Sequence, residues 1–173
     1  SVYLVDRTIP MLPTILANDV CSLKTCVPRF ALSVFVTLDA EGQVHDHRYE
    51  HTIIKCRAAL SYEEAQEVID GNASIDPEVD GALNSLLEYA QAIRALRVLR
   101  GSLDLDLPEV EVIIGPKGEP IDIRRRQRLE THRVIEDFMI LANEVVAEDF
   151  EKKGIDGLYR VHEPPAPEKM ERL

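Results

Sequence analysis

Apolar side chains recur at two different spacings along the chain, and these spacings predict strands and helices. Residues 30–38 are rich in β-branched and aromatic side chains, and residues 43–57 alternate between apolar and polar, as strands do. The turn residues 39–42 join the two segments, which predicts an antiparallel hairpin. Strands over 110–114 and 121–123, which flank a turn containing Gly and Pro, predict a second hairpin.

Helical spacing governs three longer segments. Ser61, followed by Glu64 three residues later, is the signature of a capping box, so a first helix is expected from there to about Asp70. A second helix is expected over about 79–100, where apolar side chains recur every three or four residues. A third is expected over about 130–152. These elements predict an α/β protein of the α+β kind, with antiparallel strands and hairpins packed with long helices.

The two ends of the chain suggest a piece of a longer protein. Residues 1–5 read as a strand without an initiator Met, residues 158–162 as one more short strand, and residues 164–173 as a loop entering a new helix. We therefore expect all 173 residues to form part of a single domain rather than a complete protein.

Composition narrows the class of protein. With 45% hydrophobic and 29% charged residues the chain has the make-up of a globular domain. It has no secretory signal and no apolar run near the roughly 18 residues that span a bilayer, so we expect a cytoplasmic protein without a membrane partner. Cys21, Cys26 and Cys56 are odd in number and lack Cys-x-x-Cys spacing, which favours reduced thiols over disulfides or a zinc ribbon.

Charge limits how the chain can bind nucleic acid. The formal net charge is −11, whereas phosphate binding favours a basic surface, so a nucleic-acid binder of this composition has to use a local channel or metal ions. The one basic run, Arg124–Arg128, either contacts phosphates or lies in solvent where the chain leaves the second predicted hairpin. His45, His47 and His51 share one side of a predicted strand, and an exposed polar face is favoured over a metal site there.

Four stretches of sequence together carry a family resemblance. They are Tyr3–Leu4 with Ile9–Pro13 and Asn18–Leu23, then Ala58–Ala65, Glu130–Asn143 and Leu158–Pro165. In this order and at these distances they resemble the RNB catalytic domain of the ribonuclease R and ribonuclease II family. The resemblance implies a processive hydrolase that degrades single-stranded RNA, not DNA, from its 3′ end to nucleoside 5′-monophosphates with Mg²⁺ held by carboxylates.

The family's own acidic motif is absent from these residues. Neither Asp-x₅-Asp-x-Asp-Asp nor the Arg-rich Thr-Ser-Pro-Ile-Arg-Arg-Tyr occurs, so residues 1–173 are expected to be a partial RNB domain that is inactive by itself. Asp70, Asp76, Glu78 and Asp80 imitate the acidic spacing in part, but they lie between two helices, where the family has no such motif. The alternative is a non-catalytic RNA-binding or protein-interaction relative.

The resemblance assigns candidate RNA contacts. Tyr3 matches a tyrosine that stacks on RNA near the 3′ end, and an edge-strand tyrosine is the alternative. Tyr62 matches one that lies near the terminal riboses, and a half-buried helix tyrosine with a satisfied hydroxyl is the alternative. Leu105 occupies a position where some members carry an aromatic that sandwiches the last bases. A leucine packs but does not stack, so this chain departs from the family at half of that clamp.

Helical geometry separates the polar residues of the third predicted helix. At about 100° per residue, Glu136 and Asn143 point together, away from Val134, on a side that the pattern also predicts to be partly buried. A carboxylate and an amide there need partners, which either a ribose 2′-hydroxyl or an internal polar network supplies. The remaining polar side chains are expected to form a solvated stripe: Arg133, Asp137, Glu144 and Glu148.

Overall fold

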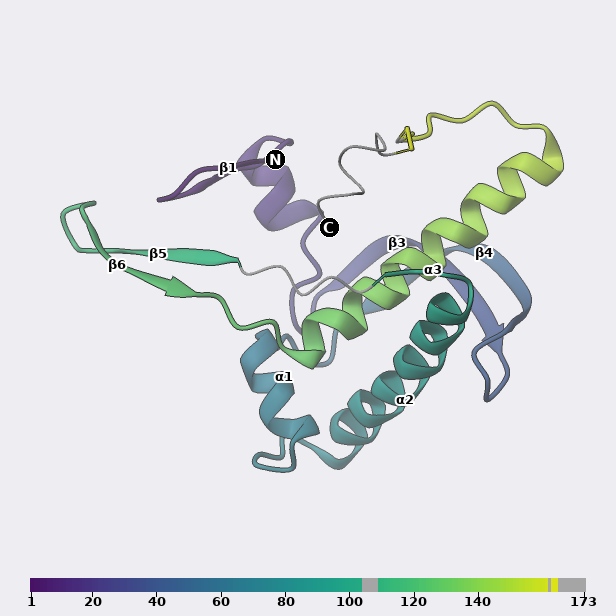
Figure 1. The fold of residues 1–173 in the computed structure, drawn as a ribbon, viewed down its shortest axis with the longest axis horizontal. Helices are drawn as coiled ribbons and strands as arrows, with labels where there is room; N and C mark the ends of the chain where they lie inside the picture. Colours follow the sequence, from purple (N-terminus) through teal and green to yellow (C-terminus); the bar gives the residue numbers. More distant parts are fainter. Residues whose placement is uncertain (104–108, 162, 165–173) are drawn as a thin grey trace. The chain divides into compact units, whose positions relative to one another are not determined.

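In a computed structural model of the chain, which describes residues 1–103, 109–161 and 163–164, helices and strands follow one another as three hairpins and three α-helices (Figure 1). The elements are β1 (Val2–Tyr3), β2 (Thr8–Ile9), the π-helical turn η1 (Leu16–Val20), β3 (Pro28–Leu38), β4 (Val44–Lys55), α1 (Tyr62–Ile69), α2 (Pro77–Leu99), β5 (Val110–Ile114), β6 (Pro120–Arg125) and α3 (Glu130–Lys153). Each named sheet is one antiparallel pair, which confirms the α+β class.

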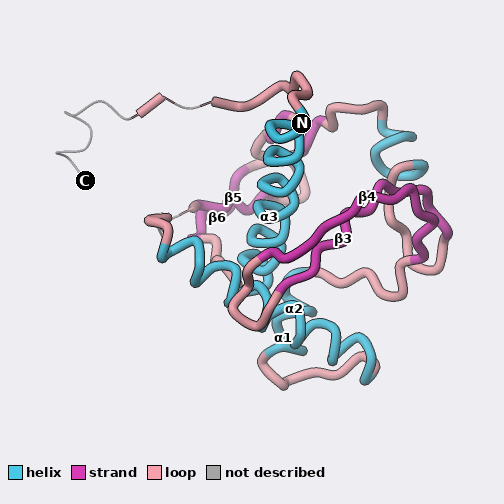
Figure 2. The backbone as a smooth tube through the Cα atoms, turned by 90° about the vertical axis from the view of Figure 1, so that its right-hand side faces the viewer, coloured by secondary structure: helices cyan, strands magenta, loops and turns pink. Residues whose placement is uncertain are grey.

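The longest hairpin is the ribbon of β3 and β4, which run side by side (Figure 2). Its turn packs directly against α2 at Gly42, a buried residue with a φ of 84°. A Cβ atom at this position would lie 2.9 Å from backbone atoms of Ala92 and Ile93. Both the left-handed backbone and this close approach require glycine, so Gly42 holds the ribbon's turn against the helix.

Local capping signals set where the helices begin. Ser61 and Glu64 form the predicted capping box, with the Glu64 N–H donating to the Ser61 hydroxyl at 3.1 Å. Helix α2 begins at Pro77, two residues before the predicted start, because the Asp76 side chain caps it by accepting from the Glu78 N–H at 2.9 Å. Proline favours the first helical position, where its missing N–H costs nothing.

Two compact units make up the chain, Ser1–Ala142 and Asn143–Leu173. In the first unit α1 packs on α2, and each of the three helices contributes buried apolar side chains: Ala65, Val68, Ala90, Ile93, Val134 and Leu141. Many larger apolar side chains stay exposed, among them Phe30 at 90% and Leu32 and Ile53 at 67% on the β3–β4 ribbon.

The second unit corrects one prediction. Helix α3 ends at Lys153, and Gly154 follows with a left-handed φ of 61°, as expected for a helix C-terminus. Residues 158–161 form no strand, contrary to the strand predicted over 158–162, of which residue 162 lies outside the described residues. Within the described part of the chain, no helix combines the length and apolar character needed to cross a membrane.

Candidate functional site

The first turn of α3 is tied to the start of α1. The Thr131 hydroxyl donates to the carbonyl oxygen of Tyr62 at 3.0 Å, and the Thr131 N–H donates to Oε1 of Gln66 at 3.1 Å. A first-turn N–H has no partner inside its own helix, so Gln66 supplies the missing acceptor. Thr131 is buried, and the two helix starts are therefore held together by specific bonds.

A stacked pair of rings lies at this junction. The rings of Tyr62 and His132 have their centroids 4.1 Å apart and an interplanar angle of 21°. Nδ1 of His132 also accepts a hydrogen bond from the Leu129 N–H at 3.2 Å. His132 thus plays the part of the Glu or Gln in a capping box, three positions after the residue that precedes the helix. Both the ring plane and the ring's rotation are set by the protein.

A cavity of about 910 Å³ opens beside this pair, which we call the Tyr3 groove. Its lining comes from the β1–β2 hairpin, the β5–β6 hairpin and the starts of α1 and α3: Tyr3, Leu4, Val5, Thr8, Glu63, Glu109, Val110, Glu111, Val112, Arg126, Gln127, Leu129 and His132. The volume is in the range of ligand pockets. Among the described lining residues, three carboxylates against one guanidinium make the groove electronegative, which favours a ligand that binds by stacking and neutral hydrogen bonds.

Two of the predicted RNA-binding residues, Tyr3 and Tyr62, lie at or next to the Tyr3 groove. Tyr3 lies in β1, is 80% exposed and lines the groove. Tyr62 begins α1 and stacks on His132, which lines the same groove. Leu105 lies outside the described residues. His132 lies in the Glu130–Asn143 stretch that carries the family resemblance, where the sequence alone assigns it no role. His132 lies three residues after Leu129, at the position where a capping box has Glu or Gln. This spacing is the sequence signal that could have identified it as a capping residue.

Two predictions about α3 are wrong. Asp137, expected in a solvated stripe, is buried with 2% of its surface exposed. Glu136 and Asn143, expected on a partly buried side, are exposed, and Glu136 pairs with Arg128 at 2.8 Å. The buried positions of α3 in the first unit are Thr131, Val134, Asp137 and Leu141, so the helix turns a face with a carboxylate inward. A charge is buried this way when it has cationic partners.

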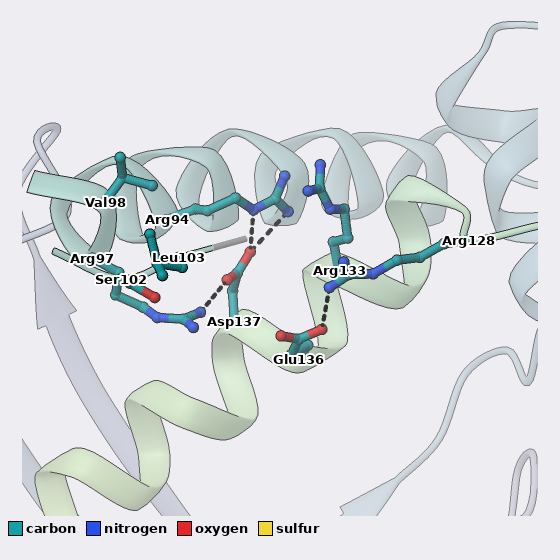
Figure 3. Close-up of a pocket in the computed structure, with 9 residues that line it drawn as sticks. All are labelled: Arg94, Arg97, Val98, Ser102, Leu103, Arg128, Arg133, Glu136 and Asp137. Carbon is teal, nitrogen blue, oxygen red and sulfur yellow. Dashed lines mark hydrogen bonds and ion pairs between the residues drawn. The ribbon is translucent and has the colours of Figure 1, made fainter. Parts of the chain in front are cut away.

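The partners of Asp137 are two arginines of α2 (Figure 3). Its Oδ2 accepts from Nε of Arg94 at 2.9 Å and its Oδ1 from Nη1 of Arg97 at 2.7 Å. Nη2 of Arg94 is buried and lies 2.8 Å from Oδ2 of Asp137, which makes the two groups an ion pair. The Nη2 group forms no hydrogen bond with the described residues. Arg94 also binds Glu130. Burial opposes the charge of Arg94, but its bonds to Glu130 and Asp137 leave its pKa raised.

A small cavity of about 40 Å³ lies beside these ion pairs. Arg128 and Arg133 also line it, the first paired with Glu136 at 2.8 Å and the second with Glu130 at 3.5 Å. Each arginine that lines this cavity is already paired with a carboxylate of α3, and the space is about that of a water molecule. The cluster therefore connects α2 and α3 and does not offer an open anion site.

The acidic residues predicted to lie between two helices serve local structure, and Glu78 and Asp80 belong to the first turn of α2. Asp76 caps α2 and pairs with Arg57 at 2.9 Å, and Glu78 also pairs with Arg57. The hydrogen bond from the Glu78 N–H, followed by that from Arg57, lowers the pKa of Asp76. Asp80 accepts from the Ser74 hydroxyl at 2.6 Å, and Asp70 accepts from Gln66 at 2.9 Å.

No cluster of three or more His, Cys, Asp or Glu side chains suited to a metal ion occurs in the described residues. Of the three histidines on β4, His45 bonds to Asp39 at 2.9 Å and His47 makes an edge contact with Tyr49. The residues of this chain that the structure describes therefore do not fit a magnesium centre, which needs several oxygen ligands around one point.

The basic run that begins at the end of β6 is largely paired with acidic neighbours. Arg124 binds Asp122 at 2.6 Å, and Arg126 lies 3.8 Å from a carboxylate oxygen of Glu109. Among the described residues that line the Tyr3 groove, Arg126 is the only arginine or lysine. These pairs are exposed, so each contributes little to stability and a stronger anionic partner can displace them.

Comparison with known proteins gives a consistent result. The model of the RNB domain family matches residues 1–173. Ribonuclease R of Thermotoga maritima is 39% identical over 177 residues, covering 100% of this chain and 25% of that protein. Ribonuclease R 1 of Lactococcus lactis is 35% identical over 176 residues, covering 100% of this chain and 22% of that protein. The chain thus spans about a quarter of the length of these relatives.

A solved structure has the same fold. Mycoplasma genitalium RNase R in complex with ribose-methylated single-stranded RNA matches with a TM-score of 0.88 at 27% identity. The match covers 94% of this chain and 26% of that one.

Proposed function

Since this chain belongs to the RNB domain family, we propose that it forms part of the RNA-binding channel of a processive 3′→5′ exoribonuclease that releases nucleoside 5′-monophosphates from single-stranded RNA. The observation that carries the proposal is the match of the family model to all 173 residues. The M. genitalium relative, solved with single-stranded RNA, supports RNA as the partner. The activity is proposed for the whole protein that contains these residues.

Within that protein the chain's own side chains bind and orient the substrate. Tyr3, exposed in the Tyr3 groove, stacks on a base near the 3′ end, which works with any base because each has an aromatic face. Tyr62, Glu136 and Asn143 are proposed to contact the terminal riboses. The exposure of Glu136 supports its role, because its carboxylate is reachable by a ligand.

We propose Mg²⁺ as the cofactor of the whole enzyme, where it would activate water for attack on the phosphodiester. Because the described residues do not fit such a centre, its ligands are proposed to come from elsewhere in the protein. We also propose a cytoplasmic location, which is supported by the three free cysteines, since thiols stay reduced in that compartment.

The decisive experiment compares the full-length protein with the chain alone. Each is incubated with 5′-labelled single-stranded RNA and Mg²⁺ or Mn²⁺, and products are resolved on a denaturing gel and by nucleotide chromatography. The full-length protein is expected to shorten the RNA from its 3′ end and to release nucleoside 5′-monophosphates, whereas the 173-residue chain is expected to release none.

Two outcomes would contradict the proposal. A full-length protein that binds RNA but never shortens it would be a non-catalytic relative. Release of monophosphates by the chain alone, abolished by Asp76→Asn, would show that the acidic residues before α2 are catalytic after all.

A further inference from the structure

The hydrogen bond from Leu129 defines which nitrogen of His132 carries the proton. Because the Leu129 N–H donates to Nδ1 at 3.2 Å, Nδ1 must present its lone pair, and a neutral imidazole then carries its proton on Nε2. None of the described residues accepts a hydrogen bond from Nε2. Within the part of the chain that the structure describes, the ring therefore offers one donor without a protein acceptor.

The direction of this donor is set in advance. The stack on Tyr62, with an interplanar angle of 21°, fixes the plane of the imidazole, and the Leu129 bond fixes its rotation. His132 stands on a helix turn that is itself held by Thr131. A donor on a rigid element with two orienting contacts loses little entropy when a ligand binds, which is how specific sites are built.

The surroundings select the acceptor. Among the described residues, His132 lines the Tyr3 groove together with Glu63, Glu109 and Glu111. Their three negative charges outnumber the positive charge of Arg126 and so disfavour a phosphate oxygen. A ribose 2′-hydroxyl is neutral and accepts one hydrogen bond while donating another. It can accept from Nε2 and donate to a carboxylate of the groove, so both of its bonds are satisfied.

On this basis we propose that His132 is a specificity-determining residue that donates from Nε2 to a ribose 2′-hydroxyl of RNA bound in the Tyr3 groove. The proposal rests on the proposed function, because it assumes that RNA enters this groove. Under this proposal Nε2 of His132 helps the protein to distinguish RNA from DNA, because only RNA carries the 2′-hydroxyl.

Two substitutions separate the two nitrogens of the ring. In the full-length protein, His132→Asn keeps an acceptor near the position of Nδ1 for the Leu129 N–H but removes the donor, whereas His132→Gln places an amide donor near the position of Nε2. His51→Asn, at an exposed histidine of β4, is the matched control. Thermal melting of each variant checks that the fold is kept.

The measurement is kcat/KM on RNA and on a series of oligonucleotides that each carry one 2′-deoxynucleotide near the 3′ end. For the wild type and His51→Asn, a deoxynucleotide at one position of the series is expected to lower kcat/KM about ten-fold relative to RNA. This is the cost scale of an unpaired hydrogen-bonding group. For His132→Asn, kcat/KM on RNA is expected to be about ten-fold below that of the wild type, and the deoxynucleotide at that position is expected to lower it no further. His132→Gln is expected to recover most of the loss in kcat/KM on RNA.

The outcomes distinguish this proposal from the proposed function. If His132→Asn keeps the wild-type loss at every deoxy position, or loses activity equally on all substrates, His132 does not contact a 2′-hydroxyl. If the wild type binds RNA without hydrolysing it, the exonuclease proposal fails, and the same oligonucleotides are compared by fluorescence anisotropy, where the same pattern of Kd values supports or overturns the role of His132. If the wild type binds no RNA, both proposals fail.

Discussion

Arg94 of α2 donates from Nε to Oδ2 of Asp137 on α3 at 2.9 Å, across 43 residues of sequence. Asp137 is buried, and Arg94 keeps 19% of its side chain exposed. Removing one partner of a buried ion pair leaves the other without compensation. This pair is consequently a main connection between the two helices.

Asp137→Ala is expected to lower the free energy of unfolding by about 3–5 kcal/mol, because Arg94 and Arg97 lose their shared carboxylate. Glu136→Ala, at the neighbouring exposed residue, is the control and is expected to change it by less than about 0.5 kcal/mol. Urea denaturation followed by circular dichroism measures both. Equal effects of the two substitutions would show that the Asp137 cluster contributes no special stability.

The cap of α2 predicts a pH dependence. The pKa of Asp76 is lowered by its hydrogen bonds from the Glu78 N–H and Arg57, so its ionised form stabilises the folded state above its unfolded pKa of about 4. This stabilisation is lost as the pH falls through the lower, folded pKa. Asp76→Asn, which keeps a capping oxygen, is expected to be less stable than the wild type at neutral pH, with a difference that shrinks in acid.

Thermal melting between neutral pH and about pH 3 tests this dependence on Asp76. Asp76→Ala, which also loses the cap, serves as a reference and is expected to stay less stable than Asp76→Asn at every pH. A gap between wild type and Asp76→Asn that does not change with pH would argue against a role of the charge.

Tyr3→Ala in the full-length protein is expected to lengthen the limit product while leaving hydrolysis of longer RNA largely intact. Stacking on one base contributes about 1–3 kcal/mol, enough to decide when a short product dissociates. Tyr3→Phe, which keeps the ring, and Tyr89→Ala, at an exposed tyrosine of α2, are the controls. The end point is read on a denaturing gel, and an unchanged ladder for Tyr3→Ala would remove this residue from the binding site.

Glu136→Ala is expected to weaken discrimination against a 3′-terminal deoxynucleotide by about 1–3 kcal/mol if its carboxylate reads the ribose. Glu148, an exposed glutamate of α3 paired with Lys152 at 2.9 Å, supplies the control Glu148→Ala. Rates on matched RNA and 3′-deoxy-terminated substrates give the answer. An equal loss on both substrates would assign Glu136 a structural role through its ion pair with Arg128.

The chain alone is expected to bind single-stranded RNA weakly, with a Kd of about 10⁻⁴–10⁻⁶ M at physiological salt. The reason is electrostatic, since the net charge is −11 and the Tyr3 groove is lined by more carboxylates than guanidinium groups. Fluorescence anisotropy with a labelled oligonucleotide measures the affinity. Tight binding that persists at high salt would mean that another surface of the chain binds RNA.

What the sequence determined by itself is the set of features that depend on neighbours a few residues away. Strand alternation and the turn between β3 and β4 predicted that hairpin, and Ser61 with Glu64 predicted the start of α1, because hydrogen bonds between backbone and nearby side chains encode both. The family resemblance also rests on short stretches in a fixed order. The cap of α2 at Asp76 is equally local and could have been predicted.

The tertiary structure alone decided which of these side chains are buried and which are brought together. The sequence could not tell that Asp137 is buried and Glu136 exposed, because the partners of Asp137 are Arg94 and Arg97, 43 and 40 residues away. The stack of Tyr62 on His132 likewise joins residues from two helices. A charged residue is expected at the surface unless a partner compensates its desolvation, and only the packing of α2 against the start of α3 supplies that partner.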